Sequence, residues 1–265
     1  MTAAVLAVGC GGETADDVDG VQSAVTEENA LSANALSANA LSANALSANA
    51  LSANALSANA LSANALSANA LSANALTATA LRDPLAREFL KYVVSCALDD
   101  HQRVAMRIDG RYYQWNGSLG LAPEWGRDHG SCDGECQRWV SACVLARVDA
   151  AGVKRMISLR GDHPALRPEA NELRKYIGRE ATYYGNVFVP GQPRFFCLSP
   201  GKMDNERVCG DSLADCPMTV VGSCDDACAD EGAYGRFEDC SDRGRARRGT
   251  VYHEAITVFL PKQMM

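Results

Sequence analysis

A five-residue repeat fills residues 29–81 and limits the folds that this segment can adopt. The unit Asn-Ala-Leu-Ser-Ala begins at Asn29 and recurs unchanged until the copy at Asn69, after which a further copy carries Thr77 in place of serine. Leucine therefore stands at every fifth position up to Leu81. In a helix, successive leucines would turn by about 140° around the axis. In a continuous strand they would alternate between faces. Only a chain that bends once per repeat keeps every leucine on one side.

Such a bend in every repeat is the principle of pentapeptide-repeat proteins, and residues 29–83 resemble that family. The resemblance implies a right-handed, four-sided β-solenoid with the leucines inside. The family places Asn or Asp directly before the central leucine, whereas here Ala35 directly precedes Leu36 and Asn34 lies two positions before it. We expect a pentapeptide-type β-solenoid, because repeats bury a core by stacking on their neighbours. A helical stalk and a disordered low-complexity stalk are the alternatives.

The N-terminus contains a motif for lipid attachment. The apolar run Val5-Leu6-Ala7-Val8-Gly9 ends directly before Cys10. It resembles a bacterial lipobox, which implies that Cys10 becomes the lipid-modified first residue and that residues 1–9 are a truncated lipoprotein signal peptide with its start codon further upstream. The run is too short to span a bilayer. The alternative is an ordinary chain terminus. Residues 10–28 contain six acidic residues and no basic ones, so we expect an acidic tether.

The remaining ten cysteines predict an oxidising compartment. Their number is even, and cytosolic thiols are kept reduced, so we expect five disulfides. Zinc is the alternative for Cys132-x3-Cys136 and Cys224-x3-Cys228, but it would leave six cysteines unexplained. We therefore predict no metal and no cofactor. The expected disulfide cysteines are Cys96, Cys132, Cys136, Cys143, Cys197, Cys209, Cys216, Cys224, Cys228 and Cys240.

Residues 84–265 have the mixed composition of a globular domain, and their patterns predict an α+β class with a disulfide-stapled tail. Asp83-Pro84 is a helix start signal, and Asp109-Gly110 suits the turn of a β-hairpin. Cys136 and Cys143 would pin the second helix to neighbours by two bridges. After Pro190 we expect the chain to consist largely of loops. The expected elements are helices at about 84–98, 133–148 and 168–177, hairpin strands at 103–108 and 111–115, and strands at 153–159 and 252–260.

Two phrases in this domain resemble stretches of predicted myxobacterial lipoproteins of unknown function. They are Trp139-Val-Ser-Ala-Cys143-Val-Leu-Ala-Arg-Val148 and Arg179-Glu-Ala-Thr-Tyr-Tyr-Gly-Asn186-Val-Phe188. The resemblance covers about residues 84–190. It implies an exported location and no particular activity.

Charge argues against nucleic acid as a partner. The net charge of the chain is −7, and six of its 32 acidic residues precede residue 29. The rest of the chain therefore carries 26 acidic residues against 25 basic ones. A nearly neutral domain lacks the basic footprint of a nucleic-acid-binding protein.

One tetrapeptide spells the nucleophile block of GDSL-type esterases, Gly210-Asp211-Ser212-Leu213. Those enzymes place the block after a buried strand and carry Asp-x-x-His near the C-terminus. Here it lies between Cys209 and Cys216, and Thr250 stands where the aspartate before His253 would be. A motif without its structural context is weak, so we interpret it as a turn.

Three further groups of polar residues have a chemical interpretation and a simpler one. Asp128-His129 and Asp162-His163 could be acid–base pairs, and an acidic loop could bind calcium, but EF-hand spacing is absent. An arginine cluster could meet anionic lipid or polysaccharide. Each group is also typical of a solvated loop. The acidic loop contains Asp225, Asp226, Asp230, Glu231 and Asp239, and the arginines are Arg243, Arg245, Arg247 and Arg248.

The sequence favours an exported protein that is lipid-anchored at the outer membrane or cell surface and has a structural or binding role. Its expected partners are the membrane, through the N-terminal lipid, and an envelope polymer or protein ligand. The alternative is a secreted hydrolase that uses one of the histidine-containing loops. A cleft in which a histidine meets a serine or a carboxylate would favour the hydrolase. No catalytic residue can be named from the sequence, because no recognised motif supplies one.

Overall fold

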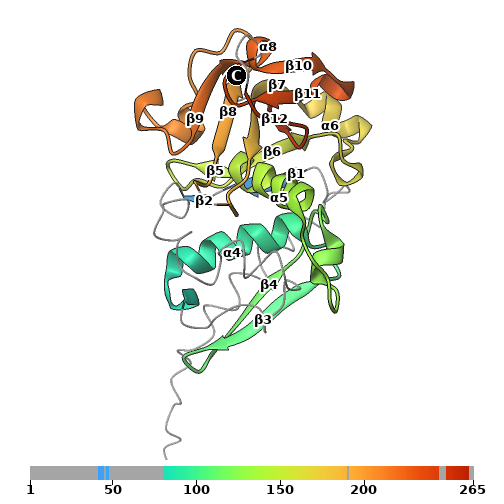
Figure 1. Ribbon diagram of the computed structural model, residues 1–265, viewed down its shortest axis with the longest axis vertical. Helices are drawn as coiled ribbons and strands as arrows, with labels where there is room; N and C mark the ends of the chain where they lie inside the picture. Colours follow the sequence, from blue (N-terminus) through green and yellow to red (C-terminus); the bar gives the residue numbers. More distant parts are fainter. Residues whose placement is uncertain (1–40, 45, 48–79, 190, 245–248, 263–265) are drawn as a thin grey trace, which may run out of the picture. The chain divides into compact units, whose positions relative to one another are not determined.

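A computed structural model describes residues 41–44, 46–47, 80–189, 191–244 and 249–262 (Figure 1). These residues form an α+β fold with several sheets, which confirms the predicted class. Cys10, the acidic tether and all but six residues of the repeat up to Thr79 lie outside the described residues. The solenoid and the lipobox therefore stay predictions.

A six-stranded sheet organises the described residues. Its strand order is β1-β6-β13-β7-β8-β9. All neighbouring strands are antiparallel except β8 and β9, which are parallel. The strands are β1 (Leu41–Asn44), β6 (Arg155–Arg160), β13 (Ile256–Pro261), β7 (Tyr176–Gly185), β8 (Arg194–Leu198) and β9 (Thr219–Ser223).

One face of this sheet carries the main hydrophobic core. Side chains alternate between the two faces of a strand, and the residues that join this core occupy alternate positions on β6, β13, β7 and β8. Helix α5 (Gly134–Ala146) packs against β7, and α4 (Pro84–Ala97) packs against α5. Figure 1 shows α5 lying between α4 and the sheet. The alternating core residues are Ile157, Leu159, Ile256, Val258, Ala181, Tyr183, Phe196 and Leu198.

The opposite face carries a second core and a three-stranded sheet. This sheet has the order β10-β11-β12, with strands β10 (Cys228–Glu231), β11 (Phe237–Ser241) and β12 (Val251–Tyr252). Tyr184 of β7 and Cys197 of β8 point away from the main core and pack with residues of the small sheet. The sequence alternation thus builds two cores on one sheet.

The first helix and the hairpin form as their sequences predict. The Asp83 carboxylate accepts a hydrogen bond from the Leu85 N–H at 2.9 Å, which caps α4. In the hairpin of β3 (Arg103–Ile108) and β4 (Arg111–Asn116), Asp109 and Gly110 have φ of 49° and 83°. Both values suit a type I′ turn, which requires positive φ at its two central residues.

Three predictions needed correction in detail. The helix expected at 168–177 is α6 (Ala170–Lys175), because β7 starts at Tyr176 and is paired on both sides. The expected closing strand is divided into β12 and β13, which belong to different sheets. The region after Pro190 contains several short strands in addition to loops. The other short elements are β2 (Leu46–Ser47), β5 (Val148–Asp149), α7 (Glu206–Cys209), α8 (Cys224–Ala227) and 3-10 turns at 80–82, 123–126, 164–166, 213–215 and 233–235.

Candidate functional site

All ten cysteines from Cys96 onward form disulfides, as their even number predicted. The five bridges lie entirely within the α+β region. They are Cys96–Cys143, Cys132–Cys136, Cys197–Cys224, Cys209–Cys216 and Cys228–Cys240.

The disulfides connect helix α5 to its surroundings in a different way from the one predicted from the sequence. Cys143 of α5 pairs with Cys96 of α4, so this disulfide joins the two helices. Cys136 pairs instead with Cys132, just before the start of α5. The expectation that two bridges pin α5 to neighbouring elements was therefore wrong. Cys136 and Cys132 are separated by four positions in sequence, and the helix cap at Asp133 bends the chain between them.

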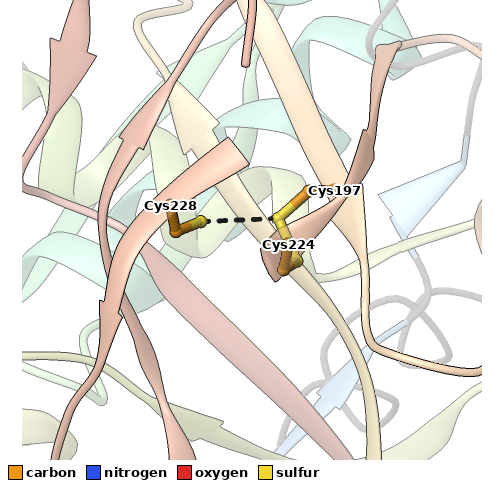
Figure 2. A group of neighbouring side chains, drawn as sticks. All are labelled: Cys197, Cys224 and Cys228. Carbon is orange, nitrogen blue, oxygen red and sulfur yellow. Dashed lines mark hydrogen bonds between the residues drawn. A yellow bond between two sulfur atoms is a disulfide. The ribbon is translucent and has the colours of Figure 1, made fainter. Parts of the chain in front are cut away.

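Two disulfides contact each other in the second core. Figure 2 shows the Cys228 sulfur beside the Cys197–Cys224 bridge, and the Cys197 and Cys228 sulfurs are 3.6 Å apart. Cys197, Cys224 and Cys228 are the one set of potential metal ligands that gathers within the described residues. Zinc binds cysteine as the thiolate. In this oxidised form, the sulfurs serve to staple β8, α8, β10 and β11 together.

His253 forms a contact with a carboxylate at the edge of the small sheet. Its Nδ1 lies 2.6 Å from Oδ1 of Asp239, which belongs to β11. Asp239 has φ of 52°, an unfavourable conformation for a residue other than glycine, and such strain gathers at functional sites. Both side chains are solvent-exposed, by 72% and 46%. In hydrolases that use a nucleophilic side chain, a histidine held by a carboxylate serves as the base, and the nucleophile lies within hydrogen-bond reach of it.

The histidine loops named from the sequence lack this arrangement. The His163 ring packs beside Trp139, and its Nδ1 accepts a hydrogen bond from the Ala165 N–H. Burial lowers the pKa of His163. Asp162 binds Arg236 instead of His163, at 2.6 Å. Asp162 and His163 are therefore not an acid–base pair.

The other named pair, Asp128 and His129, lies on an exposed loop. His129 has φ of 61°, and no hydrogen bond or ion pair joins the two side chains. In the described part of the chain, no serine, threonine or cysteine side chain donates to a histidine ring. The part of the hydrolase criterion that is met is the contact of His253 with a carboxylate, Asp239; both side chains are exposed, and no nucleophile contacts the His253 ring among the described residues.

The GDSL-like block forms a capped turn. The Ser212 hydroxyl accepts a hydrogen bond from the Ala214 N–H at 3.1 Å. The Cys209–Cys216 bridge closes the loop around it. Ser212 borders an open hollow lined by residues 204–206 and 210–213, which contain carboxylates and no histidine. The lining therefore offers Ser212 no histidine as a base.

The acidic loop and the arginine cluster do not gather into a described site. Glu231 pairs with Arg179 at 2.9 Å, and Asp239 binds His253. Asp225 lies in α8, where its N–H is capped by Ser223. Within the described ranges, the carboxylates of Asp225, Asp226, Glu231 and Asp239 form no group close enough to share an ion. Residues 245–248, which contain most of the arginine cluster, lie outside those ranges.

A buried ion pair that the sequence did not reveal lies under the main sheet. Nε of Arg207 donates to Oε1 of Glu180 at 2.8 Å, and both side chains are less than a tenth exposed. Arg207 also donates to the backbone oxygens of Ala146 and Val148, at the end of α5. Burial is the largest single influence on the pKa of Arg207 and lowers it, but the charge and hydrogen bonds of Glu180, together with Tyr183 and Asp149, outweigh burial and leave the pKa raised. The network ties α7, β7 and α5 together.

A second buried network joins α6 to β6. The Ser158 hydroxyl donates to Oε1 of Glu172 at 2.5 Å, and Nε of Arg160 donates to Ser158 at 3.1 Å. Burial raises the pKa of Glu172, although the hydrogen bond from Ser158 opposes this. Arg160 lies over the Phe259 ring at 3.6 Å, and burial lowers its pKa to about 10. Glu172 is 1% exposed, so a substrate cannot reach it.

Comparison of the chain with family models, with curated proteins and with solved structures found no match. Among the described residues, no helix has the length and apolar character needed to cross a membrane.

Proposed function

We propose that the chain is an exported protein, lipid-anchored through Cys10 at the outer membrane or cell surface. The supporting observation is that every cysteine from Cys96 to Cys240 is used in a disulfide. Such pairing belongs to an oxidising compartment, because cytosolic reductants keep thiols free. Cys10 is then the odd cysteine of the sequence, and it stands directly after the lipobox-like run.

In this proposal the α+β region is a stapled head, and the repeat is a spacer between head and anchor. The odd five-residue period supports a β-solenoid spacer, since each bend keeps leucine on the same side. The acidic tether of residues 10–28 would join the spacer to the lipid.

A binding or structural role is supported over hydrolysis. The buried networks of Glu180 and Glu172 are closed to solvent and hold elements together. His253 and Asp239 are exposed and lack a nucleophile among the described residues. A base without a nucleophile does not constitute covalent catalysis. The head would therefore present its surface to an envelope polymer or to a protein ligand.

Lipid attachment is tested by metabolic labelling with a radioactive fatty acid. The chain is expressed in a bacterium with an export signal placed upstream of the lipobox. We expect label on the natural sequence and none on Cys10→Ala. A Cys132→Ala/Cys136→Ala variant is the matched control, because it loses two cysteines and keeps Cys10, and it should label like the natural sequence. Equal labelling with and without Cys10 would overturn the anchor.

A further inference from the structure

One edge of the six-stranded sheet is completed by the repeat itself. β1 pairs antiparallel with β6, placing Leu41 opposite Ser158 and Asn44 opposite Arg155. β2 pairs in parallel with β5, placing Leu46 opposite Val148. Residues 41–44 therefore pair with β6, and residues 46–47 pair with β5. Without residues 41–44, β6 would present a row of unpaired backbone groups, which proteins normally cover.

The side of this contact that belongs to the head is held in place by an ion pair. Oδ2 of Asp149 accepts a hydrogen bond from Nε of Arg155 at 3.0 Å, which links the end of β5 to the start of β6. The other oxygen of Asp149 accepts from the Ala151 and Val153 N–H groups. Asp149 is fully buried. The turn between β5 and β6 is thereby fixed, and so is the spacing of the two strands that receive the repeat.

The seven residues that fill this edge are present many times in the chain. The sequence Leu-Ser-Ala-Asn-Ala-Leu-Ser of residues 41–47 occurs eight times between Leu31 and Ser72. Strand pairing uses backbone groups, which every residue type here supplies. A shift by one whole repeat also brings identical side chains to identical places. A shift of a strand by one residue would turn its side chains to the wrong face of the sheet, but a shift by a whole repeat does not.

We propose that the β5–β6 edge is a docking site for the chain's own repeat that any of the eight copies can occupy. Each exchange moves the head along the chain by one repeat, which is five residues. If Cys10 is the anchor, as proposed above, the spacer between anchor and head would then have a set of discrete lengths. The docking site itself does not depend on that anchor.

Loop closure sets how strongly the copies compete. A chain of 33 residues lies between Ser47 and Leu81, and 13 residues lie between Ser67 and Leu81. For a connecting chain free to change its shape, the cost of closure grows with the logarithm of its length, so the shorter connection would be favoured only about fourfold. Identical contacts and a small entropic difference leave several copies populated together.

Cross-linking of engineered cysteine pairs tests the proposal in the full chain with Cys10→Ala, which removes the anchor. Ala43 is the strand partner of Met156. Met156→Cys is combined in turn with Ala43→Cys, Ala53→Cys or Ala63→Cys, which occupy the same position in three copies. After mild oxidation, peptide mapping should find an intramolecular bridge in all three, with yields within about fivefold of one another. Thr219→Cys, on the opposite edge strand β9, replaces Met156→Cys in the matched control and should give no bridge.

Each other result rejects the proposal. A bridge at Ala43→Cys alone means one fixed register, and bridges in none of the three mean that the repeat does not dock. Bridges only between molecules mean that the edge receives a second chain. Amide exchange in the chain with intact Met156 is an independent check. Deleting five residues, Leu41–Ala45, should leave the β6 amides protected, and deleting Leu31–Ala75 should lower their protection at least tenfold.

Discussion

Glu180 and Arg207 illustrate what a buried charge requires. Each is nearly inaccessible to water, and each is neutralised by the other at hydrogen-bond distance. Removing one partner of such a pair typically costs about 3–5 kcal/mol, because the other charge stays buried. Tyr183 and Asn205 complete the network, with the Asn205 amide donating to the tyrosine oxygen at 2.6 Å. These polar residues therefore fix how α7 meets β7.

Glu172 gives the residue-scale prediction. Its folded-state pKa is raised above the usual 4.5 by burial. The folded protein thus holds the proton more tightly than the unfolded chain, so this contribution to stability is complete below pH 4.5 and is lost as pH rises through the raised pKa. Glu172→Gln should remove this loss and make the chain more stable than the natural sequence at pH 7, by a free energy of unfolding on the order of 1 kcal/mol.

Chemical denaturation from pH 4 to pH 8 measures this difference. Exposed Glu206→Gln, which lies outside α6, is the matched control and should follow the natural sequence at every pH. A difference between the Glu172→Gln variant and the natural sequence that stays constant with pH would show that the Glu172 carboxyl is not protonated in the fold.

Elements specified by local sequence signals were predicted, whereas an element specified by long-range strand pairing was not. The two strands and the turn of the hairpin were predicted, and because the Asp109-Gly110 turn fixes which residues face each other, the observed register follows from it. β7 was not predicted, although it is the longest strand described. Tyr176–Gly185 has no simple apolar alternation, because both of its faces are covered and nearly all its residues are buried.

The disulfides give the prediction at this scale. Cys96–Cys143 spans 47 positions of sequence, and Cys132–Cys136 spans four. A longer closed loop restricts the unfolded chain more, so removing the first bridge by Cys96→Ala/Cys143→Ala should cost about 4 kcal/mol. The matched variant Cys132→Ala/Cys136→Ala should cost about 2 kcal/mol. Thermal unfolding of both variants measures the order, and a larger loss for the short bridge would contradict it.

At the scale of the whole molecule, the chain combines two regions of different composition: the repeat, and after it in the sequence the disulfide-stapled head. The head buries two cores on one sheet. The repeat has leucine as its only large apolar residue, so one copy cannot form a core alone. The proposed solenoid and the proposed docking at β6 both follow from the identity of the copies, and the copy that docks on β6 lies outside the solenoid.

The solenoid is tested by substitution in the full chain. If leucines line a solenoid, Leu56→Asp buries an unpaired charge and should reduce the β-type circular dichroism of the repeat. Ser57→Asp is the matched control, because that position faces outward in the proposed coil, and it should change the spectrum little. Strong helical ellipticity would support the helical stalk. A coil spectrum with both substitutions harmless would support the disordered stalk.

Composition and local pattern were enough to establish the α+β class, the disulfide-rich character of the head, the first helix and the hairpin. These features depend on residue content and on neighbours a few residues apart, such as Asp83 with Leu85. The partners of the cysteines, the division of residues 251–261 between two sheets and the Glu180–Arg207 pair came only from the three-dimensional arrangement. Most of these contacts join residues far apart in the sequence, and no local pattern specifies which distant groups will meet. The absence of a histidine beside Ser212 and the contact of His253 with Asp239 are also of this kind, because a site is made by proximity in space.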